Sequence, residues 1–211
     1  HDISISDALE RRNNRATAVV LTHSHIDHAE GAHELARYLG VPLHTWDAAR
    51  LDKGAGDVRT LRDDAVLEVN GADVRVLPTP GHSSDSVCFV AGTSILTGDT
   101  VLGRGTTLVA HPDGRLADYL ASLQTLAEEC REHEIATLLP GHGPPLDDPD
   151  GVVEAYLKHR HERLDEICAV MKAGASTVEE IVDRVYADIP LEVRPAAIAT
   201  VRAQIEFLDN D

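Results

Sequence analysis

The chain is poor in aromatic and basic side chains. Aromatic residues make up 3% of its 211 positions, and 19 Lys and Arg stand against 36 Asp and Glu, for a formal net charge of -17 at pH 7. Proteins that bind nucleic acids usually combine a positive surface with aromatic platforms for the bases. The composition therefore disfavours a DNA or RNA partner and favours a small-molecule substrate.

Long apolar runs and paired cysteines are also missing. No stretch approaches the roughly 18 consecutive apolar residues of a membrane-spanning helix, and the opening HDISISDALERRNN lacks the apolar centre of a signal peptide. The cysteines Cys88, Cys130 and Cys168 are odd in number and widely spaced, unlike a disulfide framework. We therefore expect no membrane association and a reducing, cytoplasmic location.

The hydrophobic residues, 43% of the chain, are distributed in short periodic segments. Four apolar runs end in polar or glycine-rich turns and predict strands within 16–25, 72–82, 94–99 and 136–143. Helical spacing occurs in 30–40 and 115–133, and 87–98 is typical of two antiparallel strands joined by a tight turn. This alternation predicts an α/β fold.

The pattern changes near residue 150, after which helical segments follow one another. The stretch 152–174 is long and amphipathic, Ser176 and Glu179 have capping-box spacing, and Pro195 is placed for a helix start. We predict a catalytic domain over 1–150 and a helical domain over 151–211. The amphipathic stretch is compatible with a homodimer, although a core-facing stripe gives the same pattern.

The sequence HSHIDH directly follows the first apolar run and contains His23, His25, Asp27 and His28. Imidazole nitrogens and carboxylate oxygens are ligands for zinc and similar divalent metals. A hydrated histidine-rich loop, or a helix capped by Asp27, is the alternative interpretation of this segment alone.

Three further potential ligands, His82, Asp99 and His142, follow the other apolar runs. Each taken alone is explained as a turn residue or a helix cap. Ligand sites in α/β sheets collect in the loops beyond strand ends, so the donors from four segments are expected to converge. Together they indicate a metal site.

The motifs THSHIDH, PGHSSDS, TGDT and LPGHG resemble the successive motifs of the metallo-β-lactamase superfamily. The resemblance implies an αββα sandwich with a two-metal site between its sheets. It assigns His23, His25 and His82 to one metal, Asp27, His28 and His142 to the other, and Asp99 to a bridging position.

A second likeness, in GDTVLGRGTTLVAHPDGRLADYLASL, AYLKHRHERLDEI and VRAQIEFL, is to the beta-lactamase-like protein 2 branch. It implies a small winged-helix-like C-terminal domain, and some members of that branch cut single-stranded RNA. Residues 151–211 carry 7 basic and 12 acidic side chains, which disfavours a nucleic-acid-binding wing. Family members usually place several strands before this first motif. Only 22 residues precede His23, so we expect shortened or missing opening strands.

The resemblance also implies a mechanism, in which two divalent ions activate a bridging water as metal-bound hydroxide. Asp99 would join the ions, and Asp27 would orient the nucleophile or accept its proton. Oxygen-reducing di-iron relatives typically carry Glu at the position of His25, which favours Zn²⁺ over Mn²⁺ or Fe²⁺. Ser83, Ser84 and Asp85 are expected either to support ligand imidazoles or to stabilise their turn.

We therefore predict a zinc-dependent hydrolase acting on a small ester, thioester or lactone. Cleavage of single-stranded RNA is the first alternative. A non-catalytic scaffold or regulator, with metals only holding the loops, is the alternative of another class.

Overall fold

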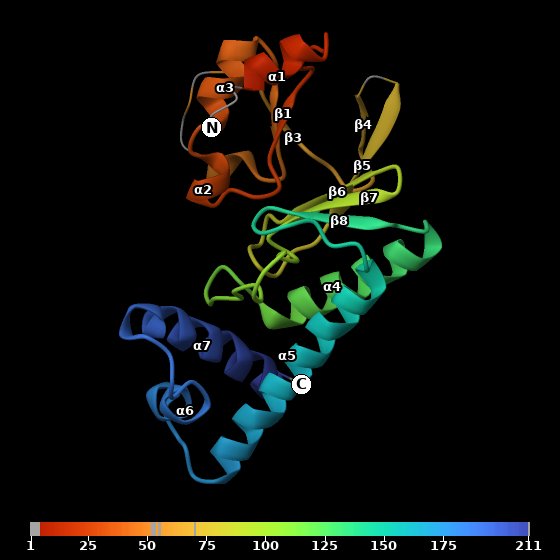
Figure 1. Ribbon diagram of the computed structural model, residues 1–211. Helices are drawn as coiled ribbons and strands as arrows, with labels where there is room; N and C mark the ends of the chain where they lie inside the picture. The colour runs from red at the N-terminus through yellow and green to blue at the C-terminus, as the bar shows by residue number, and fades with distance from the viewer. Residues whose placement is uncertain (1–4, 52–53, 55, 70, 211) are drawn as a thin grey trace.

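The chain folds into four stacked layers in a computed structural model that describes residues 5–51, 54, 56–69 and 71–210. Helices α1 and α3 cover a three-stranded sheet, which faces a five-stranded sheet, and α4 and α5 cover the far side of the latter (Figure 1). This arrangement confirms the expected αββα architecture. The C-terminal helices α6 and α7 extend from this body beside α5.

The first half of the sandwich is a parallel sheet in the order β1-β2-β3. Its elements are α1 (Ile5–Arg11), β1 (Val19–Val20), α2 (Ile26–Ala29), α3 (Ala32–Leu39), β2 (Leu43–Thr45) and β3 (Val58–Thr60). Leu21, Ala32 and Leu43 form the core between helix and sheet. Gly40 ends α3 in the left-handed conformation, as its position before Pro42 indicates.

The second half contains the strand order β4-β5-β6-β7-β8. Its strands are β4 (Val66–Val69), β5 (Ala72–Pro78), β6 (Val87–Ala91), β7 (Ser94–Gly98) and β8 (Thr137–Pro140). The predicted antiparallel pair is present as β6 and β7, while helix α4 (Leu116–Glu132) carries the chain across to the parallel strand β8. Phe89 faces one core and Cys88 the other, so β6 is buried on both faces, as expected for a strand inside a sandwich.

The C-terminal segment is helical, as predicted, and consists of α5 (Pro149–Lys172), α6 (Val178–Val185) and α7 (Arg194–Asn210). Residues 149–210 contain no strand. Helix α5 buries Val153 and Tyr156 against the second sheet and α4, so its apolar stripe faces the core. None of the described helices is long and apolar enough to cross a membrane.

The capping box of α6 lies one residue later than predicted. Thr177, not Ser176, keeps extended backbone angles and accepts the amide of Glu180, whose carboxylate accepts the amides of both Ser176 and Thr177. The prediction of Ser176 and Glu179 was wrong because two adjacent hydroxyl residues precede the helix, and spacing alone does not choose between them.

An open apolar groove of about 690 Å³ lies between the two sheets. Val20, Val66 and Leu96 line it and remain 38%, 54% and 39% exposed. Among the described residues β1 pairs on one side only, with β2. The edge beside β1 is therefore unpaired within the described part of the chain.

Tyr156 ties helix α5 to the loop after β7. Its hydroxyl accepts the amide of Leu102 at 2.9 Å and lies 3.3 Å from the carbonyl oxygens of Leu102 and Gly105. We predict that Tyr156→Phe lowers the free energy of unfolding by about 1–2 kcal/mol, because it leaves these part-buried backbone groups without a partner. Urea unfolding measures the change, with Tyr38→Phe, at a 73% exposed position, as the control that should leave stability unaltered.

Candidate metal centre

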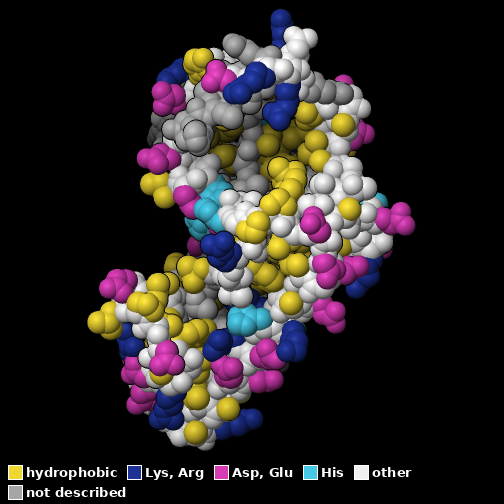
Figure 2. Space-filling model, viewed as in Figure 1, with side chains coloured by type: hydrophobic (Ala, Val, Ile, Leu, Met, Phe, Trp, Pro, Cys, Tyr) yellow, Lys and Arg dark blue, Asp and Glu magenta, His cyan; other side chains and the backbone are white. Residues whose placement is uncertain are grey.

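The structure brings all seven candidate ligands together at one edge of the sandwich. They come from the loops after β1, β5, β7 and β8 and from the short helix α2, and they are His23, His25, Asp27, His28, His82, Asp99 and His142. Figure 2 shows histidines gathered at the margin of the molecule, where its upper and lower halves meet. His111, His159 and His161 lie outside these groups of ligand atoms.

Three imidazoles form the first group. Nδ1 of His25 lies 3.1 Å from Nε2 of His23 and 3.0 Å from Nε2 of His82. Ligand atoms on a tetrahedral zinc ion, each about 2.0–2.1 Å from it, are about 3.3–3.4 Å apart. Three ring nitrogens converge at nearly this separation, so a divalent cation fits the group.

The second group contains two imidazoles and a carboxylate. Nε2 of His142 lies 3.2 Å from Nε2 of His28 and 3.2 Å from Oδ2 of Asp27. His142 and Asp27 are more than half exposed, whereas His23 and His82 are buried. The first group is therefore more enclosed than the second, although His25 is 38% exposed.

Asp99 lies between the two groups. Its Oδ1 is 3.4 Å from Nε2 of His28, and its Oδ2 is 3.8 Å from Nε2 of His82 and 3.6 Å from Nε2 of His142. Although Oδ1 is buried, it has no hydrogen-bond partner within the described part of the chain. A buried carboxylate oxygen between two sets of nitrogen ligands is the arrangement that a bridging metal ligand requires.

The electrostatics of the site keep two imidazoles of the first group, His23 and His82, neutral. Burial, followed by the charges of His28, His82 and His25, lowers the pKa of His23 to about 3. Burial is also the main reason why the pKa of His82 is lowered. Neutral imidazoles at pH 7 have a lone pair to offer a metal, so this chemistry also fits cation binding.

Each imidazole of the first group has a partner on its outer nitrogen. Nδ1 of His82 donates to the carbonyl oxygen of Leu108 at 2.7 Å, and Nε2 of His25 lies 3.4 Å from Oδ2 of Asp113. Such contacts fix which ring nitrogen carries the proton and leave the other free to bind a metal. Asp113 is therefore placed to orient His25.

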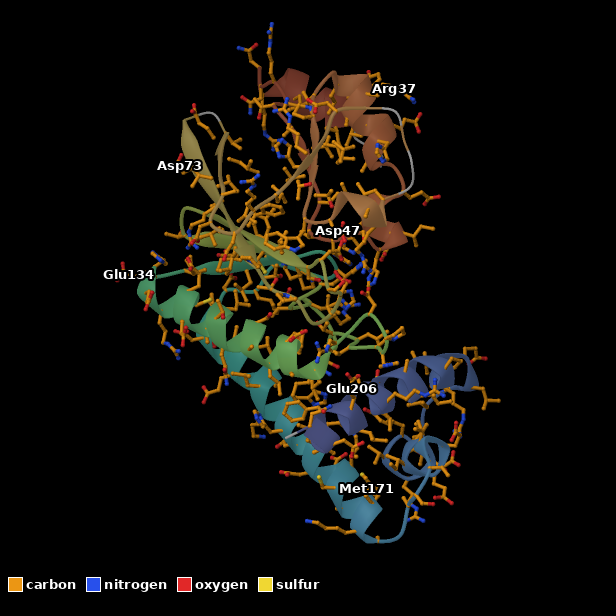
Figure 3. The ribbon with its side chains drawn as sticks, turned by 180° about the vertical axis from the view of Figure 1, so that it is seen from behind. Arg37, Asp47, Asp73, Glu134, Met171 and Glu206 are labelled. Carbon is orange, nitrogen blue, oxygen red and sulfur yellow. The ribbon has the colours of Figure 1, made fainter. Side chains whose placement is uncertain are left out.

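Arg50 holds Asp113 in place, and neither residue was predicted from the sequence. The guanidinium donates to Oδ2 of Asp113 at 2.6 Å and to the hydroxyls of Ser84 and Ser24 at 2.8 and 2.9 Å. Arg50 is the last residue of a single 3-10 turn (Ala48–Arg50) that Asp47 caps (Figure 3). This one side chain joins the first half of the sandwich to two loops of the second half.

Of the three residues that follow His82, one supports a ligand imidazole and the other two stabilise their own turn. Ser84 donates its amide and its hydroxyl to Oδ1 of Asp113 and so supports the carboxylate next to His25. Ser83 instead donates to Oδ1 of the buried Asp85 at 2.8 Å, within the turn itself. The Ser83–Asp85 contact stabilises the turn, while Ser84 acts on a ligand through Asp113.

We predict that Asp113→Ala weakens the binding of one metal ion about 10–100-fold, because His25 loses the group that orients it. Competition with a chromophoric chelator measures both binding steps. Asp118→Ala removes an exposed carboxylate near the same loop and should change neither step. Unchanged affinities in Asp113→Ala would show that His25 needs no support from Asp113.

Glycines precede three of the candidate ligands, and at two of them the reason is plain. Gly81, before His82, has a φ of +132°, and a Cβ there would lie 2.3 Å from the backbone of Tyr119. At Gly141, before His142, a Cβ would lie 2.7 Å from Oδ1 of Asp99. The loop after β8 can therefore approach Asp99 only because Gly141 has no side chain.

Gly141→Ala places a methyl group 2.8 Å from Cε1 of His28 as well as against Asp99. We expect the variant to lose most of its metal affinity in the second group, with little change in melting temperature because residue 141 is exposed. Gly31→Ala is the matched control, since its Cβ would meet nothing within 4 Å. Equal metal content in the two variants would contradict the close packing of these ligands.

Comparison with known proteins agrees with this geometry. Residues 3–142 match the family model of the metallo-beta-lactamase superfamily. A beta-lactamase-like protein 2 homolog from Caenorhabditis elegans is 30% identical over 99% of this chain and 70% of its own length. Across the most similar curated proteins the chain spans 61–70% of the relative's length.

Solved structures show the same fold. A beta-lactamase domain protein from Burkholderia ambifaria superposes with a TM-score of 0.81 at 20% identity, covering 96% of this chain and 71% of that one. Another structure, of a protein in a di-iron-bound form, has a TM-score of 0.57 at 26% identity over 72% of this chain and 81% of its own. With its His and Asp clusters in this fold, the chain belongs to the metallo-beta-lactamase superfamily, whose members are typically hydrolases.

Proposed function

We propose that the protein is a dinuclear metal-dependent hydrolase that acts on a small carboxylic ester, thioester or lactone. The observation that carries this proposal is the convergence of seven ligand side chains in two groups that meet at Asp99. A scaffold stabilised by metals would not require one group to remain open to solvent, as the exposed Asp27 and His142 leave it.

Divalent ions in such a site would polarise the substrate carbonyl and lower the pKa of a coordinated water. The chain's own residues would hold this centre: His23, His25 and His82 on the more enclosed side, Asp27, His28 and His142 on the open side, and Asp99 between them. Asp113 and Arg50 keep His25 oriented during turnover. No serine or cysteine nucleophile is needed.

Asp27 is the residue that we propose as the proton acceptor. Its carboxylate is 55% exposed and lies 3.2 Å from Nε2 of His142. Burial raises the pKa of Asp27, but its own backbone and the charges of His28 and His142 outweigh this effect and lower it overall. The carboxylate is therefore ionised at neutral pH and able to accept a proton from the attacking water.

Charge and ligand chemistry support the rest of the proposal. The net charge of -17 repels polyanions, so a compact substrate is favoured over RNA. Five imidazoles and two carboxylates suit zinc, which is the metal that we propose, with iron and manganese as competitors. The free cysteines support the reducing, cytoplasmic location.

The zinc-loaded protein should hydrolyse at least one member of a panel that contains a short-chain aryl ester, an acyl thioester and a lactone. Asp99→Ala should reduce this turnover to background, because the two ligand groups lose their shared residue. Asp118→Ala removes an exposed carboxylate that belongs to none of the ligand groups and should retain full activity. Labelled single-stranded RNA is included as a fourth substrate.

Two results would contradict the proposal. Cleavage of the RNA alone, abolished by Asp99→Ala, would replace acyl hydrolysis with ribonuclease activity. A protein that holds two metal ions but leaves all four substrates intact would favour the non-catalytic scaffold.

A further inference from the structure

A second pocket lies next to the metal centre, where the helical C-terminal segment meets the sandwich. Its volume is about 340 Å³, and it lies between residues 106–108, helix α5 and helix α7. Helix α7 crosses below the loop that carries residues 106–108 (Figure 1). The pocket therefore exists only because the C-terminal helices pack against this loop.

The pocket is positively charged although the chain is strongly acidic. His159, Arg160 and Arg163 line it, whereas no Asp or Glu does so within the described part of the chain. In a protein with a net charge of -17, such a local excess of cationic side chains is unexpected on composition alone. Burial, followed by the charges of Arg160 and Arg163, lowers the pKa of His159, as a positive environment does.

Arg160 has no carboxylate partner among the described residues, although it is only 4% exposed. Its Nη2 donates to the carbonyl oxygen of Thr107, its guanidinium lies 4.9 Å above the ring of Tyr119, and its Nε has no acceptor within the described part of the chain. Burying a cation without an opposing charge is costly. An anionic ligand nearby would supply that charge.

Arg163 is the more solvent-accessible of the two arginines that line the pocket. It is 22% exposed, contacts the exposed Glu166 at 2.6 Å and stacks on the ring of Tyr186 at 4.7 Å. Tyr186, Ile189, Val193 and other apolar side chains complete the lining. The pocket thus combines a cationic end with an apolar wall, which suits an amphipathic acid better than a bare inorganic anion.

The pocket and the metal centre share one wall. Leu108 lines the pocket, while its carbonyl oxygen accepts a hydrogen bond from the ligand His82 at 2.7 Å. Thr107 also lines it, and its hydroxyl donates to the carbonyl oxygen of Asp99 at 2.9 Å. The side chain of Leu108 is 43% exposed and lies between the pocket and His82 in the chain's contacts.

We propose that this pocket binds the carboxylate end of a small amphipathic acid, and that the substrate of the metal centre carries such a carboxylate beyond its scissile bond. The second half of the proposal rests on the hydrolase function proposed above. A chain lying across Leu108 would place its carboxylate near Arg160 and Arg163 and its acyl carbonyl near the metal ligands.

Calorimetric titration of the zinc-loaded protein with hexanoate tests the binding. Hexanoate should bind more tightly than 1-hexanol, which lacks the charge, and than inorganic phosphate, which lacks the apolar chain. Arg163→Gln should weaken hexanoate binding roughly tenfold, because a charge-assisted hydrogen bond is lost. Arg202→Gln removes the same charge from an exposed position on α7 and should leave the affinity unchanged.

Ala196→Trp provides a second test, since residue 196 lines the pocket and a large side chain there should fill it and abolish hexanoate binding. Hexanoate bound directly to the metals would bind equally well to Arg163→Gln and Ala196→Trp, and that result would overturn the inference. Tighter binding of phosphate than of hexanoate would overturn the assignment to a carboxylate.

The kinetics of ester hydrolysis distinguish a failure of this inference from a failure of the proposed function. The monoester of a six-carbon dicarboxylic acid should have a lower KM than the matching hexanoate ester. Arg163→Gln should remove this difference in KM, whereas Arg202→Gln should preserve it. Equal KM values in an active enzyme would contradict the substrate assignment alone. Loss of all ester hydrolysis, with hexanoate binding retained, would contradict the proposed function but not the pocket.

Discussion

Asp99 is the residue on which the arrangement of the site depends, because it contacts both groups of ligands from a buried position. Its carboxylate lies within 3.8 Å of His28, His82 and His142, which come from three different segments. The imidazoles of His28 and His82 lie beside a carboxylate oxygen that has no hydrogen-bond partner in the described part of the chain, and burying these groups together is costly. Divalent cations would offset that cost, and the loops that converge there are arranged to hold them.

The loop between β7 and α4 connects this centre to the rest of the molecule. Thr107 and Leu108 contact the residues Asp99 and His82, while Tyr156 and Arg160 of α5 hold the same loop from the other side. Helix α5 therefore supports the loop that contacts two of the candidate metal ligands, and it also lines a pocket. On this account the helical segment is part of the functional unit.

Much of the site could be predicted from the sequence because each ligand motif follows an apolar run, and strand ends of one sandwich meet at a common edge. The short strands β2, β3 and β4 were not predicted, since they contain only three or four residues and are partly polar. Arg50 and Asp113 were also missed, because nothing in their local sequences distinguishes them from other loop charges. Their role arises only from the contact of segments 63 positions apart.

Anomalous diffraction from crystals of the zinc-loaded protein tests the central claim most directly. The account predicts two zinc peaks about 3.5–4 Å apart, one surrounded by His23, His25 and His82 and the other by Asp27, His28 and His142, with Asp99 touching both. A single peak, or zinc bound away from these seven side chains under saturating metal, would contradict it.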